Sequence, residues 1–337
     1  MRTPLTCLLA VHAALLAGAA TDVRVCAGCH REQARTQPHT AMGHALEPVA
    51  QCTILKNNPK LVFRQAPYSY EIVRDGDASV YTVTDGARSI RVPLAWAFGL
   101  GFAGQTYVYS YNGNLYESRV SFYNQTGALD LTIGATRAAP KDLEEAAGRL
   151  MHQQDALECF ACHATNASKD GRLDVASMSA GVLCERCHEG VARHLESLRA
   201  SSAAPAPPPR LGKLTTDEMS DFCGECHRTW ETIALNGPRG VANVRFQPYR
   251  IARSKCYDAA DPRIGCVACH DPHRPAEQTA SFYDGKCLAC HAALKKCPVG
   301  AKDCASCHMP AYGLEGSHHQ FHDHNIRVAK AGDAYPD

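Results

Sequence analysis

Hydrophobic and polar residues alternate with a period of two through the middle of the chain, between residues 53 and 137. Successive side chains of a β-strand point to opposite faces of a sheet, so this pattern predicts half-buried strands. We expect strands at 61–63, 68–73, 80–84 and 89–92, with Asp-Gly turns at 75–76 and 85–86. The clearest hairpin runs over 106–111 and 115–123, because Asn112-Gly113 between them favours a two-residue turn.

Other patterns flank this segment. Residues 141–153 form a charged amphipathic pattern that predicts a helix, and residues 181–200 predict a further helical segment. Residues 201–209 are rich in Ser, Ala and Pro, which is typical of a stiff exposed linker. Apolar residues 5–16 follow Arg2 and precede three small residues at 17–19, the pattern of a cleaved signal peptide. We therefore predict a signal peptide at 1–20 and a periplasmic or extracellular protein; a retained N-terminal anchor is the alternative, although the run is short for a membrane span.

One motif, Cys-x-x-Cys-His, occurs seven times and uses fourteen of the eighteen cysteines. We number the copies along the chain as motifs 1 to 7: Cys26-Cys29-His30, Cys159-Cys162-His163, Cys184-Cys187-His188, Cys223-Cys226-His227, Cys266-Cys269-His270, Cys287-Cys290-His291 and Cys304-Cys307-His308.

This spacing is that of a c-type haem attachment site. Two cysteines three positions apart can form thioethers to both vinyl groups of one porphyrin, and the following histidine then reaches the iron as proximal ligand. Zinc sites, iron–sulfur clusters and disulfide scaffolds give no reason for a histidine after the second cysteine every time. We predict seven covalently bound haem c groups and no catalytic side chain.

The motifs divide the chain into unequal parts. We expect a first haem segment at 21–52, a β-rich haem-free segment at 53–137 and a six-haem region at 138–337. The last part has about 33 residues per motif, too little chain to build an ordinary hydrophobic core. We therefore predict a mostly α-helical and irregular fold packed around the haems, with a β-rich segment between the first and second motifs.

Histidines outside the motifs are numerous enough to provide sixth ligands for all seven irons. The mature chain leaves nine of them, and a soluble protein of this size rarely carries so many without a metal-binding use. Our distal candidates are His44, His39, His152, His194, His273, His318 and His324. Asp323 or a backbone carbonyl could orient an imidazole of the tail. The first motif is ambiguous, because His39, Met42 and His44 all follow it closely.

Two further features leave alternatives open. The hairpin is rich in tyrosine, at positions 107, 109, 111, 116 and 123; it either covers haem edges or forms an exposed platform for docking or substrate. Cys52, Cys256 and Cys297 lie outside the motifs, and in an oxidising compartment we expect two of them, Cys256 and Cys297, to pair.

The motif-bearing parts resemble the multihaem c-type cytochromes of the doubled Cys-x-x-Cys-His type. That group includes the tetrahaem cytochrome that accepts electrons from hydroxylamine oxidoreductase. The resemblance lies in residues 181–190 with His194, residues 266–273, residues 304–310 and the tail 318–327. It implies that His194, His318 and His324 ligate haems bound to other motifs, and it covers the β segment much less.

We predict an exported electron carrier with a chain of mostly bis-histidine haems. The alternatives are a reductase or oxidase of a small nitrogen or sulfur compound at an open first haem, and a subunit of an extracellular haem filament. The formal net charge is +1. Each ferric haem would add about −2 from its propionates and +1 at its iron–porphyrin core, so seven haems would add roughly −7 and make the holoprotein anionic. We expect redox proteins as partners, such as quinol-linked or other cytochromes, and no nucleic acid; peripheral membrane association and the oligomeric state stay open.

Overall fold

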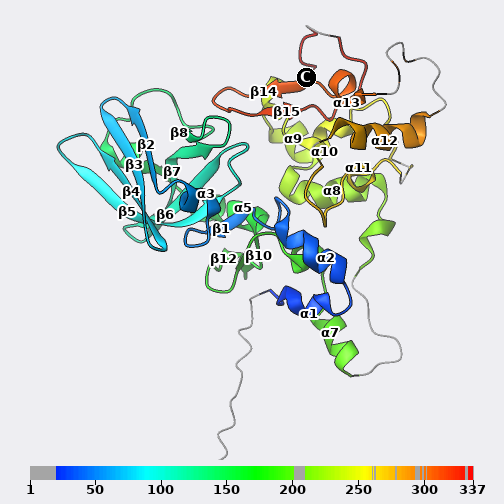
Figure 1. Ribbon diagram of the computed structural model, residues 1–337, viewed down its shortest axis with the longest axis horizontal. Helices are drawn as coiled ribbons and strands as arrows, with labels where there is room; N and C mark the ends of the chain where they lie inside the picture. The colour runs from blue at the N-terminus through cyan, green and yellow to red at the C-terminus, as the bar shows by residue number, and fades with distance from the viewer. Residues whose placement is uncertain are drawn as a thin grey trace, which may run out of the picture.

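The computed structural model describes residues 20–200, 209–259, 261, 263–277, 279–292, 297, 300, 302–330 and 333–336. The predicted signal peptide, except for Ala20, and the predicted linker, except for Pro209, lie outside these residues. A β-domain lies on one side of the molecule and a region of short helices on the other (Figure 1).

The β-domain is a nine-stranded antiparallel sheet, and seven of its strands follow one another in chain order. These strands are β2 (Lys60–Gln65), β3 (Tyr68–Asp75), β4 (Ala78–Thr84), β5 (Ser89–Phe98), β6 (Gln105–Tyr111), β7 (Asn114–Tyr123) and β8 (Ala128–Leu131). β1 (Leu46–Pro48) pairs with β5, and β9 (Gly148–Leu150) pairs with β7. The outer strands β2 and β8 also contact each other, so the sheet curls into a near-barrel.

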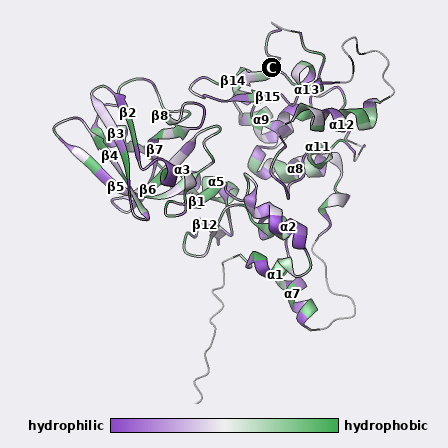
Figure 2. Cartoon of the chain, viewed as in Figure 1, coloured by the Kyte–Doolittle hydropathy of each residue, from purple (hydrophilic) through white to green (hydrophobic). Residues whose placement is uncertain are grey.

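The predicted strands are confirmed, and each lies inside one of β2 to β7. Asn112 and Gly113 both have positive φ, 49° and 78°, as the mirror-image turn of a two-residue hairpin requires. Hydrophobic and hydrophilic residues mix along the strands (Figure 2). On β4, for example, buried and partly exposed positions alternate, which places one face of the sheet in the core of the domain.

That core is made of protein side chains alone. Tyr70, Tyr81, Tyr107 and Tyr109 are each 1% exposed or less and pack with aliphatic residues of the sheet. Helix α3 (Thr53–Asn57) and helix α4 (Leu143–Ala147) contribute further buried residues to the same cluster. The domain therefore has its own hydrophobic core, which requires no cofactor.

The predicted fold class is wrong. We expected a mostly α-helical and irregular haem-packed fold, whereas 34% of the structure is helical, 24% is strand and a large antiparallel sheet forms a β-rich domain. The sheet is also wider than the alternating pattern indicated, because β1 and β9 are three-residue strands from the flanking segments. Strands this short carry too few positions for a period of two to be recognised.

The helix predicted at 141–153 is interrupted at Gly148. The chain forms α4, continues as strand β9 and becomes helical again in α5 (Gln153–His163). A Cβ atom at Gly148 would collide with the carbonyl oxygen of Glu117 on β7. The close pairing of β9 with β7 thus overrides the local helical pattern.

The helical region consists of short segments connected by irregular chain. Its helices are α1 (Val23–Ala27), α2 (Arg31–Thr36), α5, α6 (Cys184–Cys187), α7 (Val191–Arg199), α8 (Thr216–His227), α9 (Trp230–Asn236), α10 (Gln247–Ile251), α11 (Cys266–Cys269), α12 (Ala280–His291) and α13 (Cys304–His308). Near the C-terminus, β14 (Ala311–Gly313) and β15 (Gln320–His322) form a small hairpin.

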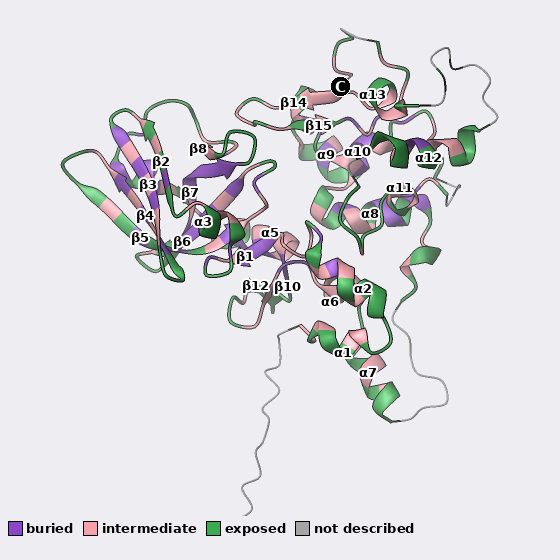
Figure 3. Cartoon of the chain, viewed as in Figure 1, coloured by how far each residue is buried: buried purple, intermediate pink, exposed green. Residues whose placement is uncertain are grey.

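Burial differs sharply between the two parts (Figure 3). Within the described part of 209–336, the buried hydrophobic residues are Met219, Ile233, Val244 and Tyr249. Four such side chains cannot hold this much chain in place, since hydrophobic burial is the main favourable contribution to folding. The helical region depends on something other than a protein core.

Candidate haem-binding centre

All seven motifs adopt the same local structure, a helical turn. Motifs 3, 5 and 7 form the short helices α6, α11 and α13, and motifs 2, 4 and 6 form the last turns of α5, α8 and α12. Motif 1 begins in α1, and its His30 amide donates to the carbonyl oxygen of Cys26 at 2.8 Å. A single turn brings both cysteines and the histidine to one side of the backbone, as one porphyrin requires.

The motifs are also neighbours in space. Cysteine side chains of different motifs are in contact in four pairs: Cys26 with Cys184, Cys162 with Cys226, Cys223 with Cys266, and Cys287 with Cys304. Two more pairs are close enough to interact electrostatically, Cys187 with Cys226 and Cys269 with Cys287. The motifs therefore follow one another in the order 1, 3, 4, 5, 6 and 7, with motif 2 beside motif 4. Helices α1 and α13 lie at opposite ends of the helical region (Figure 1).

Two proximal histidines have hydrogen bonds that suit a metal ligand. Nδ1 of His163 lies 2.8 Å from the carbonyl oxygen of Ala45, and Nδ1 of His308 lies 2.9 Å from that of Arg327. A proton on Nδ1 leaves the lone pair on Nε2 for iron. Burial lowers the pKa of His163, His188 and His227, which favours the neutral imidazole that binds metal.

Two proximal histidines face histidines that were predicted as distal ligands. The rings of His188 and His273 are nearly parallel, at 10°, with centroids 6.1 Å apart. The rings of His270 and His324 have centroids 6.2 Å apart. Metal–imidazole bonds of about 2.0 Å on opposite sides of one metal give a centroid separation of about 6 Å. These two pairs therefore have the spacing of axial ligands that share an iron.

The donor set fits haem c, and there is open space next to it. A cavity of about 550 Å³ lies beside His188 and is also lined by Glu185 and Lys169, a volume in the usual range for cofactor sites. A model of the family described as "Cytochrome c554 and c-prime" matches residues 131–189, which include motifs 2 and 3. The chain is a c-type cytochrome. Its cofactor is covalently bound haem c, and its role is electron transfer.

No curated protein and no solved structure gives a significant match to this cytochrome. Among its described residues, no helix has the length and apolar character needed to span a membrane.

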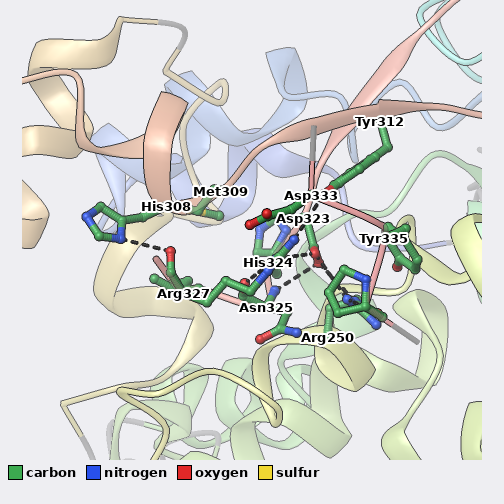
Figure 4. Close-up of polar contacts among 12 residues, drawn as sticks. Arg250, His308, Met309, Tyr312, Asp323, His324, Asn325, Arg327, Asp333 and Tyr335 are labelled. Atoms are coloured by element: carbon green, nitrogen blue, oxygen red, sulfur yellow. Dashed lines mark hydrogen bonds and ion pairs between the residues drawn. The ribbon is translucent and has the colours of Figure 1, made fainter. Parts of the chain in front are cut away.

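The tail of the cytochrome is held by a buried ionic network, shown in Figure 4. Arg250 of α10 and Asp323 are both fully buried and paired, with Nε–Oδ1 and Nη2–Oδ2 distances of 2.9 and 3.0 Å. Arg327 binds the same carboxylate at 2.7 Å, and Tyr335 stacks against the Arg250 guanidinium. The network fixes the backbone on both sides of His324.

His324 is oriented by a carbonyl group and not by the neighbouring carboxylate. Its Nδ1 lies 3.0 Å from the carbonyl oxygen of His322, while Asp323 binds the two arginines. Burial lowers the pKa of His324 to about 4, so its imidazole is neutral at physiological pH. Arg250 was missed by the sequence reasoning, and nothing in its local sequence distinguishes it from a surface arginine.

The other distal candidates have different surroundings. His318 faces the β-domain, with Nε2 2.9 Å from Oδ2 of Asp130 and its ring against Tyr123. His152 is exposed at the start of α5, and His194 is half-buried on α7. The predicted ligand role of these three histidines stays a prediction.

The surroundings of motif 1 stay ambiguous. His39 and His44 face each other, with ring centroids 6.4 Å apart, and Nδ1 of His44 lies 2.9 Å from Oε1 of Glu47. His30 itself is exposed. The Glu47 contact leaves Nε2 of His44 as the free nitrogen of that ring, which suits a metal ligand.

Two predictions from the sequence are wrong. Tyr107, Tyr109, Tyr116 and Tyr123 are buried, so the hairpin forms no exposed platform, while its role as a cover for haem edges stays a prediction. The rings of Tyr107, Tyr109 and Tyr116 pack in the interior of the near-barrel. The predicted disulfide is not formed, since Cys256 and Cys297 are both free thiols.

Proposed function

We propose that this cytochrome is an exported heptahaem electron carrier that passes electrons between redox proteins along its seven attachment motifs. The observation that carries the proposal is the unbroken sequence of neighbouring motifs, from motif 1 at one end of the helical region to motif 7 at the other. Bound haem supplies one-electron chemistry at each motif.

The protein side chains support transfer of electrons without bond chemistry. His188 with His273, and His270 with His324, have ring separations at which each pair would hold one iron between its two imidazoles. Iron held in this way would have no open position for a substrate. Burial keeps these imidazoles neutral by lowering the pKa of His188, His270 and His324.

The ends of the motif sequence are the places where partners would exchange electrons. Motif 1 has an exposed second cysteine and an exposed histidine. Towards the other end, motif 6 has the same two residues exposed and motif 7 has an exposed second cysteine. With the haem propionates added, the surface would be anionic, which favours partners with basic patches. Quinol-linked or other cytochromes have the required chemistry, and the signal-peptide pattern supports export.

The haem count is tested directly on purified holoprotein. We expect an intact mass equal to the mature chain plus seven haems, and a pyridine haemochrome content of seven haems per chain. The same mass locates the N-terminus and so tests cleavage of residues 1–20. A lower haem content, or an N-terminus at Met1, would contradict the corresponding part of the proposal.

The ligation state separates an electron carrier from an enzyme. We expect the electron paramagnetic resonance spectrum of the ferric protein to contain only low-spin haem. A high-spin signal that disappears on addition of nitrite, hydroxylamine or cyanide would show an open iron and would favour a reductase or oxidase instead.

A further inference from the structure

We propose that Arg186 raises the reduction potential of the haems bound at the point where motifs 2, 3 and 4 meet. An electron moving along the haems would then be held most strongly at this junction. Arg186 is one of the two variable residues of motif 3. The inference rests on the proposed haem attachment at these three motifs.

The Arg186 side chain joins three motifs through its own contacts. Its Nε donates to the carbonyl oxygen of Ala161 in motif 2 at 3.1 Å. Its Nη2 lies 3.1 Å from Oε2 of Glu225 and 3.8 Å from the sulfur of Cys226, both in motif 4. One guanidinium therefore lies against residues of motif 2 and motif 4 while belonging to motif 3.

The three sulfur atoms around Arg186 share one position in their motifs. Cys162, Cys187 and Cys226 are each the second cysteine, the one directly before the proximal histidine. The Arg186 guanidinium lies within electrostatic range of all three sulfurs. The same charge would act on the three porphyrin edges that these sulfurs attach.

The charge of Arg186 is only partly compensated. Its side chain is 27% exposed, whereas that of its partner Glu225 is 54% exposed, so water screens the carboxylate more than the guanidinium. Reduction removes one positive charge from a ferric haem. A neighbouring cation disfavours the ferric state, because like charges repel, and so raises the potential.

Arg186 also holds three segments together mechanically, so the test must separate charge from structure. A purely structural role predicts loss of stability when either Arg186 or Glu225 is changed. An electrostatic role predicts potential shifts of opposite sign, because the two residues carry opposite charges.

The experiment is a spectroelectrochemical titration of the holoprotein and four variants. Arg186→Gln should raise the ratio of ferric to ferrous haem at the junction about tenfold at a fixed potential, a shift of 59 mV to more negative values for a one-electron step. Glu225→Gln should shift the curve in the positive direction, and Arg186→Lys should keep most of the wild-type potential. Arg88→Gln is the matched control, since Arg88 pairs with Asp85 on an exposed turn of the β-domain, and it should change nothing.

Several results would overturn the proposal. An unchanged titration curve for Arg186→Gln at full haem content would refute the proposal. Equal negative shifts for Arg186→Gln and Arg186→Lys would also refute it, because the effect would then come from the shape of the guanidinium group and not from its charge. If Arg186→Gln does not incorporate haem, Glu225→Gln decides alone, and a negative or absent shift there refutes the idea. A wild-type protein without haem at motifs 2 to 4 would refute both this inference and the proposed function. A full haem content with no shift in potential would refute this inference alone.

Discussion

Removing the carboxylate of Asp323 is the most informative perturbation of the tail. Asp323 is fully buried and accepts hydrogen bonds from Arg250, from Arg327 and from the backbone amide of Asn325. Asp323→Ala would leave the buried guanidinium of Arg250 without its counter-charge. Breaking a buried pair in this way costs about 3–5 kcal/mol, because the remaining charge stays out of water.

The loss has a local and a global readout. We expect the free energy of unfolding of the helical region, followed by the Soret band in denaturant, to fall by about 3–5 kcal/mol. His324 lies next to Asp323 in the sequence, so its imidazole should lose its fixed position, and a high-spin signal should appear at motif 5. The β-domain has a separate core, and its tyrosine fluorescence should report an unchanged transition.

An exposed ion pair provides the control. Arg274 and Glu32 lie 3.1 Å apart with side chains 60% and 47% exposed, and Glu32→Gln should cost less than about 1 kcal/mol. If Asp323→Ala is as mild as this control, the buried pair does not hold the tail and the reasoning is wrong.

Three further predictions concern other parts of the molecule. Burial raises the pKa of Tyr70 and Tyr123 to about 12, so folding favours their protonated forms. This contribution to stability is complete below pH 10 and is lost as the pH rises towards 12. Tyrosinate absorbance and loss of the β circular dichroism signal should therefore appear together. His273→Ala should convert one haem, that of motif 3, from low to high spin in the electron paramagnetic resonance spectrum. Gly148→Ala should destabilise the β-domain by about 1–3 kcal/mol, measured by denaturant unfolding, because the new Cβ collides with the carbonyl oxygen of Glu117.

Each of these has a matched comparison. His319→Ala, at a histidine outside our distal candidates whose ring packs on Phe102 and Phe321, should leave the spin state unchanged, and a high-spin signal there would contradict our placement of the ligands. Gly285→Ala in α12 meets open space and should be neutral or stabilising, since alanine is the better helix former. Gradual titration of the buried tyrosines in a protein that stays folded would contradict the alkaline prediction.

The sequence was sufficient for features that depend on local patterns. The alternation of residues located β2 to β7, Asn112-Gly113 located the turn between β6 and β7, and the motif spacing located seven helical turns. His273 and His324 could be selected from the spare histidines by their positions, and the structure places both opposite a proximal histidine.

The rest depends on contacts between distant segments. Nothing near Arg250 in the sequence indicates Asp323, 73 residues away, and nothing near Arg186 indicates Glu225. The closure of the sheet was missed because it depends on contact between β2 and β8, at its two ends. Hydrophobic periodicity shows which residues of a segment face the core and which face solvent. It does not show which other segment packs against the buried face.

The near-barrel also bears on how the cytochrome matures. Motif 1 and motif 3 are neighbours, although 157 residues separate Cys26 from Cys184 and the whole β-domain lies between them. A chain that waited for haem before folding would have to close this entire loop at once. Because the β-domain can fold on its own core, most of the intervening chain is ordered beforehand, and the loop left to close is much shorter. The β-domain would then act as a folded spacer that brings two attachment sites together before either cofactor is joined.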